Sequence, residues 1–299
     1  MSVKPEVDRE HLNAVFMRWL EVSATRKAGL RMVQTLSGAL TGRRCLAVLA
    51  DDVLLGAALQ KGGGQWSTVS ILEEPGLVAA SLFGSALATM HEGRIPQPDH
   101  SFDLVVLDQV LEHFEDDGGV ISECHRVLNE SGILVVRTVR QRRFSLTGVI
   151  RRLLGMANYG RGRARPGYTE SLLFDILKDG FDTEDVRTGS RFFAELAETM
   201  IQVAVVLSGA ARPGATGQVG DRERTLHTYR KIARMHAVFY PVALLGQLLD
   251  GLLFLSRGHR LAIRARRRDW KPRRTPSLKD GRSIAEATIN TKIGTAGPF

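Results

Sequence analysis

The chain has 299 residues, of which 43% are hydrophobic and 24% charged, an ordinary composition for a folded protein with a sizeable core. Its two cysteines, Cys45 and Cys124, exclude a disulfide framework and a cysteine-based zinc site. The formal net charge of +9 comes from one segment, because Arg257–Arg282 holds eleven basic and two acidic residues and the rest of the chain balances.

The N-terminal part of the sequence predicts helices. Apolar residues recur at helical spacing between residues 9 and 39, so we assign residues 1–40 to N-terminal helices. The first six residues lack the apolar stretch of a signal peptide. We therefore expect a cytoplasmic protein whose two thiols are buried in a reducing compartment.

Residues 41–193 predict the core of the protein. Buried strands are predicted at 45–49, 66–72, 102–107 and 133–139. Helices are predicted between them at 54–60, 73–83 and 117–128. Strands that alternate with helices indicate an α/β fold with a mostly parallel sheet, covered by helices on both faces. The residues 129–132 read as a turn, with Gly132 in the left-handed conformation.

The character of the sequence changes after Arg140. A basic, glycine-containing crossover at 140–165 precedes a predicted helix at 170–178 and one or two strands at 181–193. Strongly apolar helices at 192–207 and 237–255 then indicate a hydrophobic helical extension, which we assign to residues 194–265. The composition of residues 266–299 predicts a basic, disordered tail.

The apolar run 237–255 approaches the length of a membrane span. Pro241, Gln247 and Asp250 argue against a simple span, because a charge at mid-depth is costly. An interfacial helix, a lid over the core and a membrane-inserted segment are the alternatives. Residues 237–274 add a basic cluster that would be attracted to anionic lipid at the inner face of the membrane. A nucleic acid partner is not favoured, since no recognition module accompanies the basic residues.

Three motifs follow one another in the second half of the core. They are Ile95–Val106 (IPQPDHSFDLVV), Val110–His113 (VLEH) and Glu123–Leu134, which contains RVL and a glycine turn. This stretch, Arg94–Val139, resembles the class I S-adenosylmethionine (SAM)-dependent methyltransferases of type 11. More distantly, residues 25–265 resemble a bacterial subgroup of that family with a hydrophobic C-terminal extension.

The resemblance implies a Rossmann-like, doubly wound sheet of seven strands, with SAM as the cofactor. In an open parallel sheet, ligands bind beyond the carboxyl ends of the strands, at the point where the strand order reverses. The cofactor-binding residues that the resemblance implies are Leu49, Ala50, Asp51, Asp52, Ser70, Ile71, Glu92, Gly93, Asp108 and Gln109.

The first loop departs from the family pattern of aspartate-x-glycine-x-glycine-x-glycine. None of the matching positions is a glycine: they are Ala47, Leu49, Asp51 and Val53. Glycine lets a backbone approach a ligand closely, whereas a β-branched valine resists positive φ. Ser70 replaces the acid that accepts the ribose hydroxyls, and Glu73 or Glu74 is the alternative acceptor.

His113 is the candidate catalytic residue, because an imidazole can act as a general base near neutral pH. The alternative is that Glu112 and His113 form a structural pair at the start of a helix. No group of Cys, His and carboxylate residues has the spacing of metal ligands.

These observations predict SAM-dependent methyl transfer to a small, amphipathic acceptor that is lipid-linked or of glycan type. The alternative is a catalytically inactive protein of the same fold, which acts as a binding or scaffold module at the membrane surface. Methyl transfer depends mainly on positioning the acceptor, so no catalytic side chain decides between the two.

Overall fold

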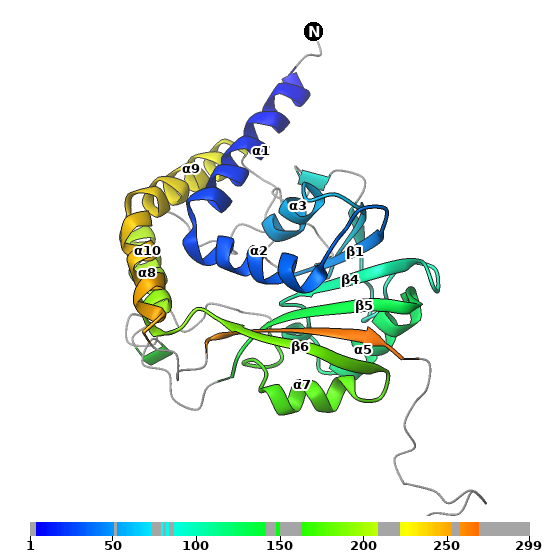
Figure 1. The fold of residues 1–299 in the computed structure, drawn as a ribbon. Helices are drawn as coiled ribbons and strands as arrows, with labels where there is room; N and C mark the ends of the chain where they lie inside the picture. The colour runs from blue at the N-terminus through cyan, green and yellow to red at the C-terminus, as the bar shows by residue number, and fades with distance from the viewer. Residues whose placement is uncertain are drawn as a thin grey trace, which may run out of the picture.

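A sheet of seven strands forms the centre of the computed structural model (Figure 1). The structure describes residues 4–50, 53–72, 79, 82–83, 87–141, 148–149, 163–208, 222–252 and 258–268. The strands are β1 (Arg44–Leu49), β2 (Gln65–Ser70), β3 (Leu87–Thr89), β4 (Phe102–Asp108), β5 (Leu128–Val139), β6 (Phe181–Gly189) and β7 (Arg260–Arg267). Their order is β3-β2-β1-β4-β5-β7-β6, and only β7 runs antiparallel to its neighbours.

Two strands were not predicted from the sequence: the short β3, and β7, whose residues were assigned to the helical extension and the basic tail. Four apolar side chains of β7 are buried in the sheet: Leu261, Ala262, Ile263 and Ala265. The arginines between and after them pair with the neighbouring strand, because both Arg264 and Arg266 contact Glu184 of β6. This part of the basic cluster therefore belongs to the sheet.

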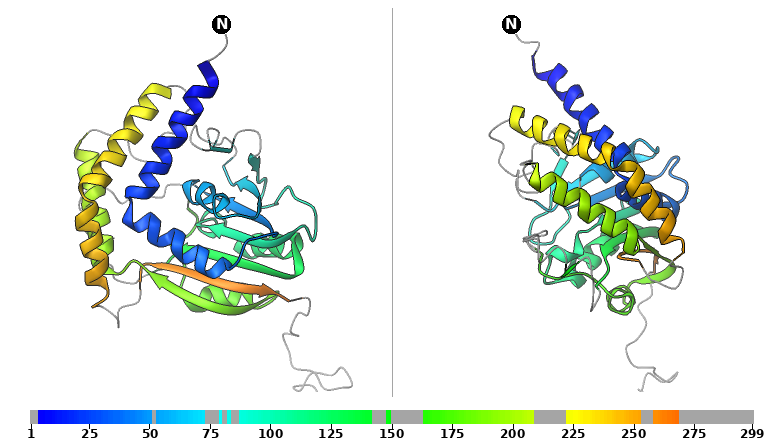
Figure 2. Two further views of the ribbon diagram at one scale, coloured as in Figure 1. Left: turned by 45° about the horizontal axis from the view of Figure 1, so that its top comes forward. Right: turned by 90° about the vertical axis from the view of Figure 1, so that its left-hand side faces the viewer.

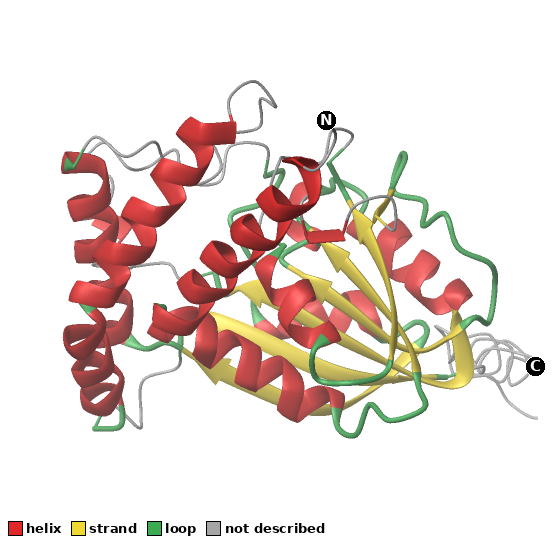
Figure 3. Ribbon diagram, turned by 90° about the horizontal axis from the view of Figure 1, so that it is seen from above, coloured by secondary structure: helices red, strands yellow, loops and turns green. Residues whose placement is uncertain are grey.

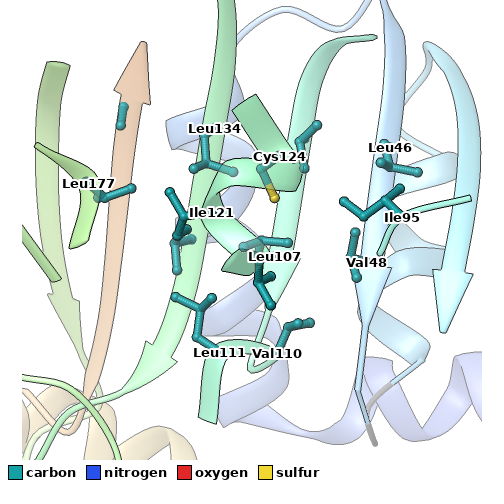
Figure 4. Close-up of a cluster of buried hydrophobic side chains, with 14 of the residues drawn as sticks. Leu46, Val48, Ile95, Leu107, Val110, Leu111, Ile121, Cys124, Leu134 and Leu177 are labelled. Atoms are coloured by element: carbon teal, nitrogen blue, oxygen red, sulfur yellow. The ribbon is translucent and has the colours of Figure 1, made fainter. Parts of the chain in front are cut away.

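Helices cover both faces of the sheet (Figure 3). They are α2 (Ala24–Ser37), α3 (Leu54–Gln60), α5 (Asp117–Val127) and α7 (Glu170–Leu177). On one face α2 and α3 pack against the strands through Val33, Leu36 and Leu59. On the other face α5 and α7 contribute Ile121 and Leu177 to the cluster drawn in Figure 4. The predicted doubly wound α/β fold is thereby confirmed.

β5 is longer than the sequence analysis predicted. It begins at Leu128, so residues 129–132 belong to the strand and do not form a separate turn. The pairing of β5 with β4 shifts register between Phe102 and Leu104. Gly132 is not among the residues with positive φ, so its predicted left-handed conformation was wrong.

A helical unit stands at the end of the sheet where β6 finishes (Figure 2). It consists of α1 (Lys4–Val22), α8 (Phe192–Leu207), α9 (Arg222–Val238) and α10 (Tyr240–Asp250). Aromatic side chains join α1 to α9, because the ring centroid of Tyr229 lies 5.0 Å from that of Phe16 and 5.3 Å from that of Trp19. The predicted N-terminal helices therefore separate, α1 into this unit and α2 onto the sheet.

The apolar run predicted as one helix is two helices. The chain bends by 54° between His227–Val238 and Tyr240–Asp250, where Pro241 begins a new helix. Within the described residues, no single helix is long and apolar enough to span a membrane, although this bent pair meets that criterion by length and composition. Asp250 is buried, and its carboxylate accepts hydrogen bonds from backbone N–H groups in the first turn of α8, at 2.7 and 2.8 Å.

Candidate functional site

The last residues of β1, β2, β3 and β4 align in one row across the sheet, and Arg137, two residues before the end of β5, extends this row. Leu49 of β1 pairs in register with Ser70 of β2 on one side and with Asp108 of β4 on the other. Ser70 pairs in turn with Thr89 of β3, and Asp108 pairs with Arg137 of β5. These five residues are called the carboxyl row below.

The strand order reverses in the middle of the carboxyl row. The chain proceeds from β1 outward to β2 and β3, and then crosses to β4 and β5 on the other side of β1. The crevice between β1 and β4 is the place where open α/β sheets bind their ligands. The structure brings Leu49, Ser70 and Asp108 together at this crevice, and their contact with a cofactor stays a prediction.

Leu49 is fully buried, and its side chain faces α3. It belongs to an apolar cluster with Ala47 and Val53. A Cβ atom added to Gly56 of α3 would lie 2.5 Å from Leu49 Cδ1, so the leucine occupies room that this glycine leaves open. The missing loop glycine at position 49 is thus matched by a glycine on the facing helix.

The remaining residues of the first loop divide between the two faces. Ala50 is buried in the cluster on the α5 and α7 side of the sheet. Val53, expected to crowd the loop, packs instead in the cluster next to α3. Asp51 and Asp52 lie outside the described residues, so their predicted contacts with a cofactor stay predictions.

The end of β2 provides a hydroxyl group where the family pattern has an acid. Ser70 is 1% exposed, and its Oγ accepts a hydrogen bond from the backbone N–H of Leu72 at 3.1 Å. The N–H of Ile71 donates to the carbonyl of Leu49 at 3.0 Å, which ties this loop to β1. The Ser70 hydroxyl is therefore engaged within its own turn. Glu73 and Glu74, the alternative acceptors, lie outside the described residues.

Asp108 forms a buried ion pair with Arg137 inside the carboxyl row. Arg137 Nε and Nη2 donate to the two carboxylate oxygens at 2.5 and 2.7 Å, and both side chains are at most 5% exposed. The guanidinium lies against Gly29 of α2, where a Cβ atom would be 2.3 Å from Arg137 Nη1. A second arginine, Arg260, stands nearby and pairs with Glu195 of α8 at 3.7 Å. The Asp108 carboxylate is thus committed to holding β4, β5 and α2 together.

The loop after β4 adopts an uncommon backbone conformation. Gln109 has a φ of 54°, and its N–H donates to the carbonyl of Arg137 at 2.8 Å. Its side-chain oxygen accepts a hydrogen bond from Arg163 Nη2 at 3.3 Å. A non-glycine residue with positive φ at a ligand edge is typical of functional loops. Arg163 was not predicted as a site residue, because it lies within the basic crossover at 140–165, which has no recognisable motif.

Glu112 holds the β4 loop to the end of β5. Its Oε1 accepts hydrogen bonds from Thr138 Oγ1 at 2.6 Å and from the N–H of Val139 at 2.8 Å, and the side chain is fully buried. These contacts join the loop after β4 to β5, and the choice between a functional and a structural role for Glu112 and His113 stays open. His113 ends the short 3-10 helix η2 (Leu111–His113) and is partly exposed, and its role as a general base stays a prediction.

Tyr168, which was not among the predicted site residues, also contacts the loop that follows β4. Its hydroxyl lies 2.9 Å from Asp117 Oδ2 and 3.0 Å from the carbonyl oxygen of Leu111. Burial, and then the hydrogen bond to Asp117, raise the pKa of this phenol above its ordinary value, so it stays protonated. The preceding residue, Gly167, has a φ of 139°, and a Cβ atom there would lie 2.5 Å from the carbonyl oxygen of Val139.

Glu92 and Gly93 lie shortly after Thr89, the residue of β3 in the carboxyl row. They follow β3 in a tight turn, with φ angles of 49° and 79°, and Glu92 is exposed. Both line an open hollow of about 400 Å³ together with Phe114 and Asp116, near the start of α5. The contact of these two residues with a cofactor stays a prediction.

The described side chains fit the usual nucleoside arrangement poorly. A bound ribose needs an acceptor for its two hydroxyl groups, and a carboxylate serves best. Among the described residues of the carboxyl row, Asp108 is the one carboxylate, and it is bound to Arg137. The strand-end backbone between β1 and β4 is the part of this edge that a cofactor could use.

The family model of a methyltransferase domain matches residues 73–136 of this chain. This segment overlaps most of Arg94–Val139, on which the resemblance rested. A probable S-adenosylmethionine-dependent methyltransferase of Mycolicibacterium smegmatis is 45% identical over 51 residues, which are 17% of this chain and 20% of that protein. One from Mycobacterium tuberculosis (strain H37Rv) is 47% identical over 51 residues, 17% of this chain and 19% of that protein. The chain thus matches about a fifth of the length of these relatives.

Solved structures with a similar arrangement include the [4+2]-cyclase SpnF and a SAM-dependent methyltransferase of Aquifex aeolicus. SpnF is 17% identical, with 81% of this chain and 83% of that chain covered and a TM-score of 0.49. The Aquifex protein is 18% identical, with 56% and 85% covered and a TM-score of 0.41. At these values the two structures add nothing on activity. The family match and the curated relatives support a class I methyltransferase family for this chain, and its bacterial subgroup stays a prediction.

Proposed function

We propose that this protein is a SAM-dependent methyltransferase that acts on a small, amphipathic acceptor, lipid-linked or of glycan type. The observation that carries the proposal is the family match over residues 73–136, which include β4 and the loop that follows it. That loop opens at the carboxyl row, next to the switch point of the sheet. Methyl transfer from a sulfonium depends chiefly on positioning the acceptor, so it needs few reactive side chains.

The acceptor class rests on the position of the helical unit. α8 begins shortly after β6 ends, so the unit stands beside the edge at which a ligand is expected. Glu195 of α8 pairs with Arg260, which neighbours the Asp108–Arg137 pair. An apolar unit connected in this way to the ligand edge suits an acceptor with an apolar part.

A second candidate function is a binding or scaffold module that keeps the fold without transferring a methyl group. Three observations favour it: Leu49 is packed against α3, Ser70 is bonded within its own turn, and Asp108 is held by Arg137. Leu49 has no polar group, and the Asp108 carboxylate is paired with Arg137, so neither side chain offers the usual ribose acceptor. The two candidates differ in one property, the ability to bind SAM.

Titration calorimetry with SAM and with S-adenosylhomocysteine separates the candidates. The enzyme predicts saturable binding of both ligands, with dissociation constants of about 1–100 µM. If Glu73 or Glu74 supplies the ribose acceptor, its change to Gln weakens binding by about tenfold, whereas Glu130→Gln, at an exposed position in β5, leaves it unchanged. Absence of binding to either ligand at about 1 mM rejects the methyltransferase and leaves the binding module.

A further inference from the structure

The helix α10 buries its small residues and exposes its large apolar ones. Ala243 and Gly246 face the interior of the helical unit, whereas Leu245 is 55% exposed and Leu248 is 69% exposed. The surface helix of a soluble protein has the opposite pattern, with large apolar side chains inside and polar ones outside. The outer face of α10 is therefore built for an apolar environment.

The buried face of α10 is specialised for close contact with α8. A Cβ atom on Gly246 would lie 2.9 Å from the carbonyl oxygen of Phe193, so the two helix backbones approach closely at this glycine. Asp250 caps the first turn of α8 by accepting its backbone N–H groups. These contacts fix the orientation of α10, so the large side chains on its other face cannot turn inward.

Most of the exposed large apolar side chains of the described protein gather in this region. Six of the eleven lie between residues 238 and 252 and form what we call the apolar face: Val238, Val242, Leu244, Leu245, Leu248 and Leu252. Their exposed area is on the order of 600 Å², the upper end for the largest patch on a soluble monomer. Figure 2 shows α10 on the outside of the helical unit.

The composition of the apolar face favours lipid over a second copy of the chain. A standard protein interface buries about 800 Å² on each partner and includes aromatic anchors and hydrogen bonds. The apolar face is smaller, entirely aliphatic, and without a hydrogen-bonding side chain. Arg234, which is exposed on α9 one turn before Val238, places a cation where an interfacial helix meets lipid head groups.

The structure separates this face from the basic cluster that followed it in the sequence. Arg264 and Arg266 are paired with Glu184 inside the sheet, and Arg268 is paired with Asp182. These three arginines share two carboxylates, so they serve mainly to join the strands of the sheet. The basic residues from 269 to 274 lie outside the described residues, so the candidate docking surface is α10.

We propose that α10 docks the protein on a lipid bilayer, lying in the plane of the interface with its apolar face among the acyl chains. The occupant is a bilayer surface with anionic head groups, which the exposed cation of Arg234 would favour. Docking would hold the helical unit, and with it the neighbouring ligand edge, against the membrane. This proposal is independent of methyl transfer.

The test is flotation of the full-length chain with vesicles of phosphatidylcholine and about 30 mol % phosphatidylglycerol. The variant Leu245→Glu/Leu248→Glu places two charges on the apolar face, where both side chains are exposed and the fold does not depend on them. The matched control is Met200→Glu/Leu207→Glu, which makes the same change at two exposed positions of α8. Circular dichroism and thermal melting check that all three proteins fold alike.

The proposal predicts that the wild type and the α8 control float, and that the α10 variant binds at least about tenfold more weakly. Equal flotation of the α10 variant and the wild type would overturn it, as would a wild type that stays with the unbound protein. Analytical ultracentrifugation without lipid tests the alternative that the apolar face binds a second copy of the chain. A wild-type dimer that the α10 variant abolishes would assign the apolar face to a second copy of the chain.

Discussion

Replacing Asp108 with Asn tests whether this carboxylate belongs to the architecture or to a cofactor site. The substitution keeps the shape of the side chain but removes the charge that faces Arg137, which is at most 5% exposed. It leaves a buried guanidinium with Arg260 nearby, and breaking such a pair costs about 3–5 kcal/mol. A loss of about 3 kcal/mol lowers the melting temperature by roughly 6–12 °C in a domain of this size.

Urea denaturation measures the effect, and two further variants isolate its cause. Asp108→Asn/Arg137→Met removes both charges, so it should be less destabilised than Asp108→Asn alone. Asp185→Asn removes the acid of an exposed ion pair with Arg187 and should cost less than about 1 kcal/mol. The reasoning is refuted if Asp108→Asn unfolds with the free energy of the wild type but binds S-adenosylhomocysteine more weakly, because Asp108 would then be a ligand-binding residue.

Three other predictions concern packing, pH and helix capping. Gly56→Ala should lower the free energy of unfolding by about 1–2 kcal/mol, because the added methyl group meets Leu49. The double variant Gly56→Ala/Leu49→Ala should lose less stability than the sum of the two single variants, and a double-mutant cycle by chemical denaturation measures this difference. Burial lowers the pKa of His236 below its ordinary 6.5, so acidification below about pH 6.5 protonates this residue in the unfolded chain first and lowers stability. Between pH 7 and 5, the melting temperature should therefore fall less for His236→Gln than for the wild type. An equal fall for both proteins would contradict this. Asp250→Ala should cost about 1–2 kcal/mol through loss of the cap on α8, and an unchanged denaturation midpoint would show that the cap contributes nothing.

Most strands of the sheet could be predicted because they have a local signature, whereas β3, with three residues, is too short to show one. Cys45–Leu49 and Phe102–Leu107 are continuous apolar runs, which parallel strands buried on both faces require. The motifs between Arg94 and Val139 also gave the order of β4, α5 and β5. β7 has no such signature, since its arginines read as a tail until Glu184, about 80 residues upstream in the chain, is brought beside them.

The candidate site could be predicted as an edge of the sheet but not as a set of contacts. The position of Leu49, Ser70 and Asp108 follows from where their strands end. Their partners do not, because Arg137 lies 29 residues from Asp108 and meets it only through strand pairing. The close packing of Leu49 against Gly56 likewise cannot be inferred from the sequence, which shows only that position 49 lacks the glycine of the family pattern.

Hydrogen exchange with S-adenosylhomocysteine tests the central claim, that the crevice between β1 and β4 binds the cofactor of a methyltransferase. The ligand should slow exchange in the segments that follow Leu49, Ser70 and Asp108, and should leave the amides of α10 unchanged. The account is contradicted if saturating ligand protects none of these three segments, or protects only the hollow beside Glu92 and the start of α5.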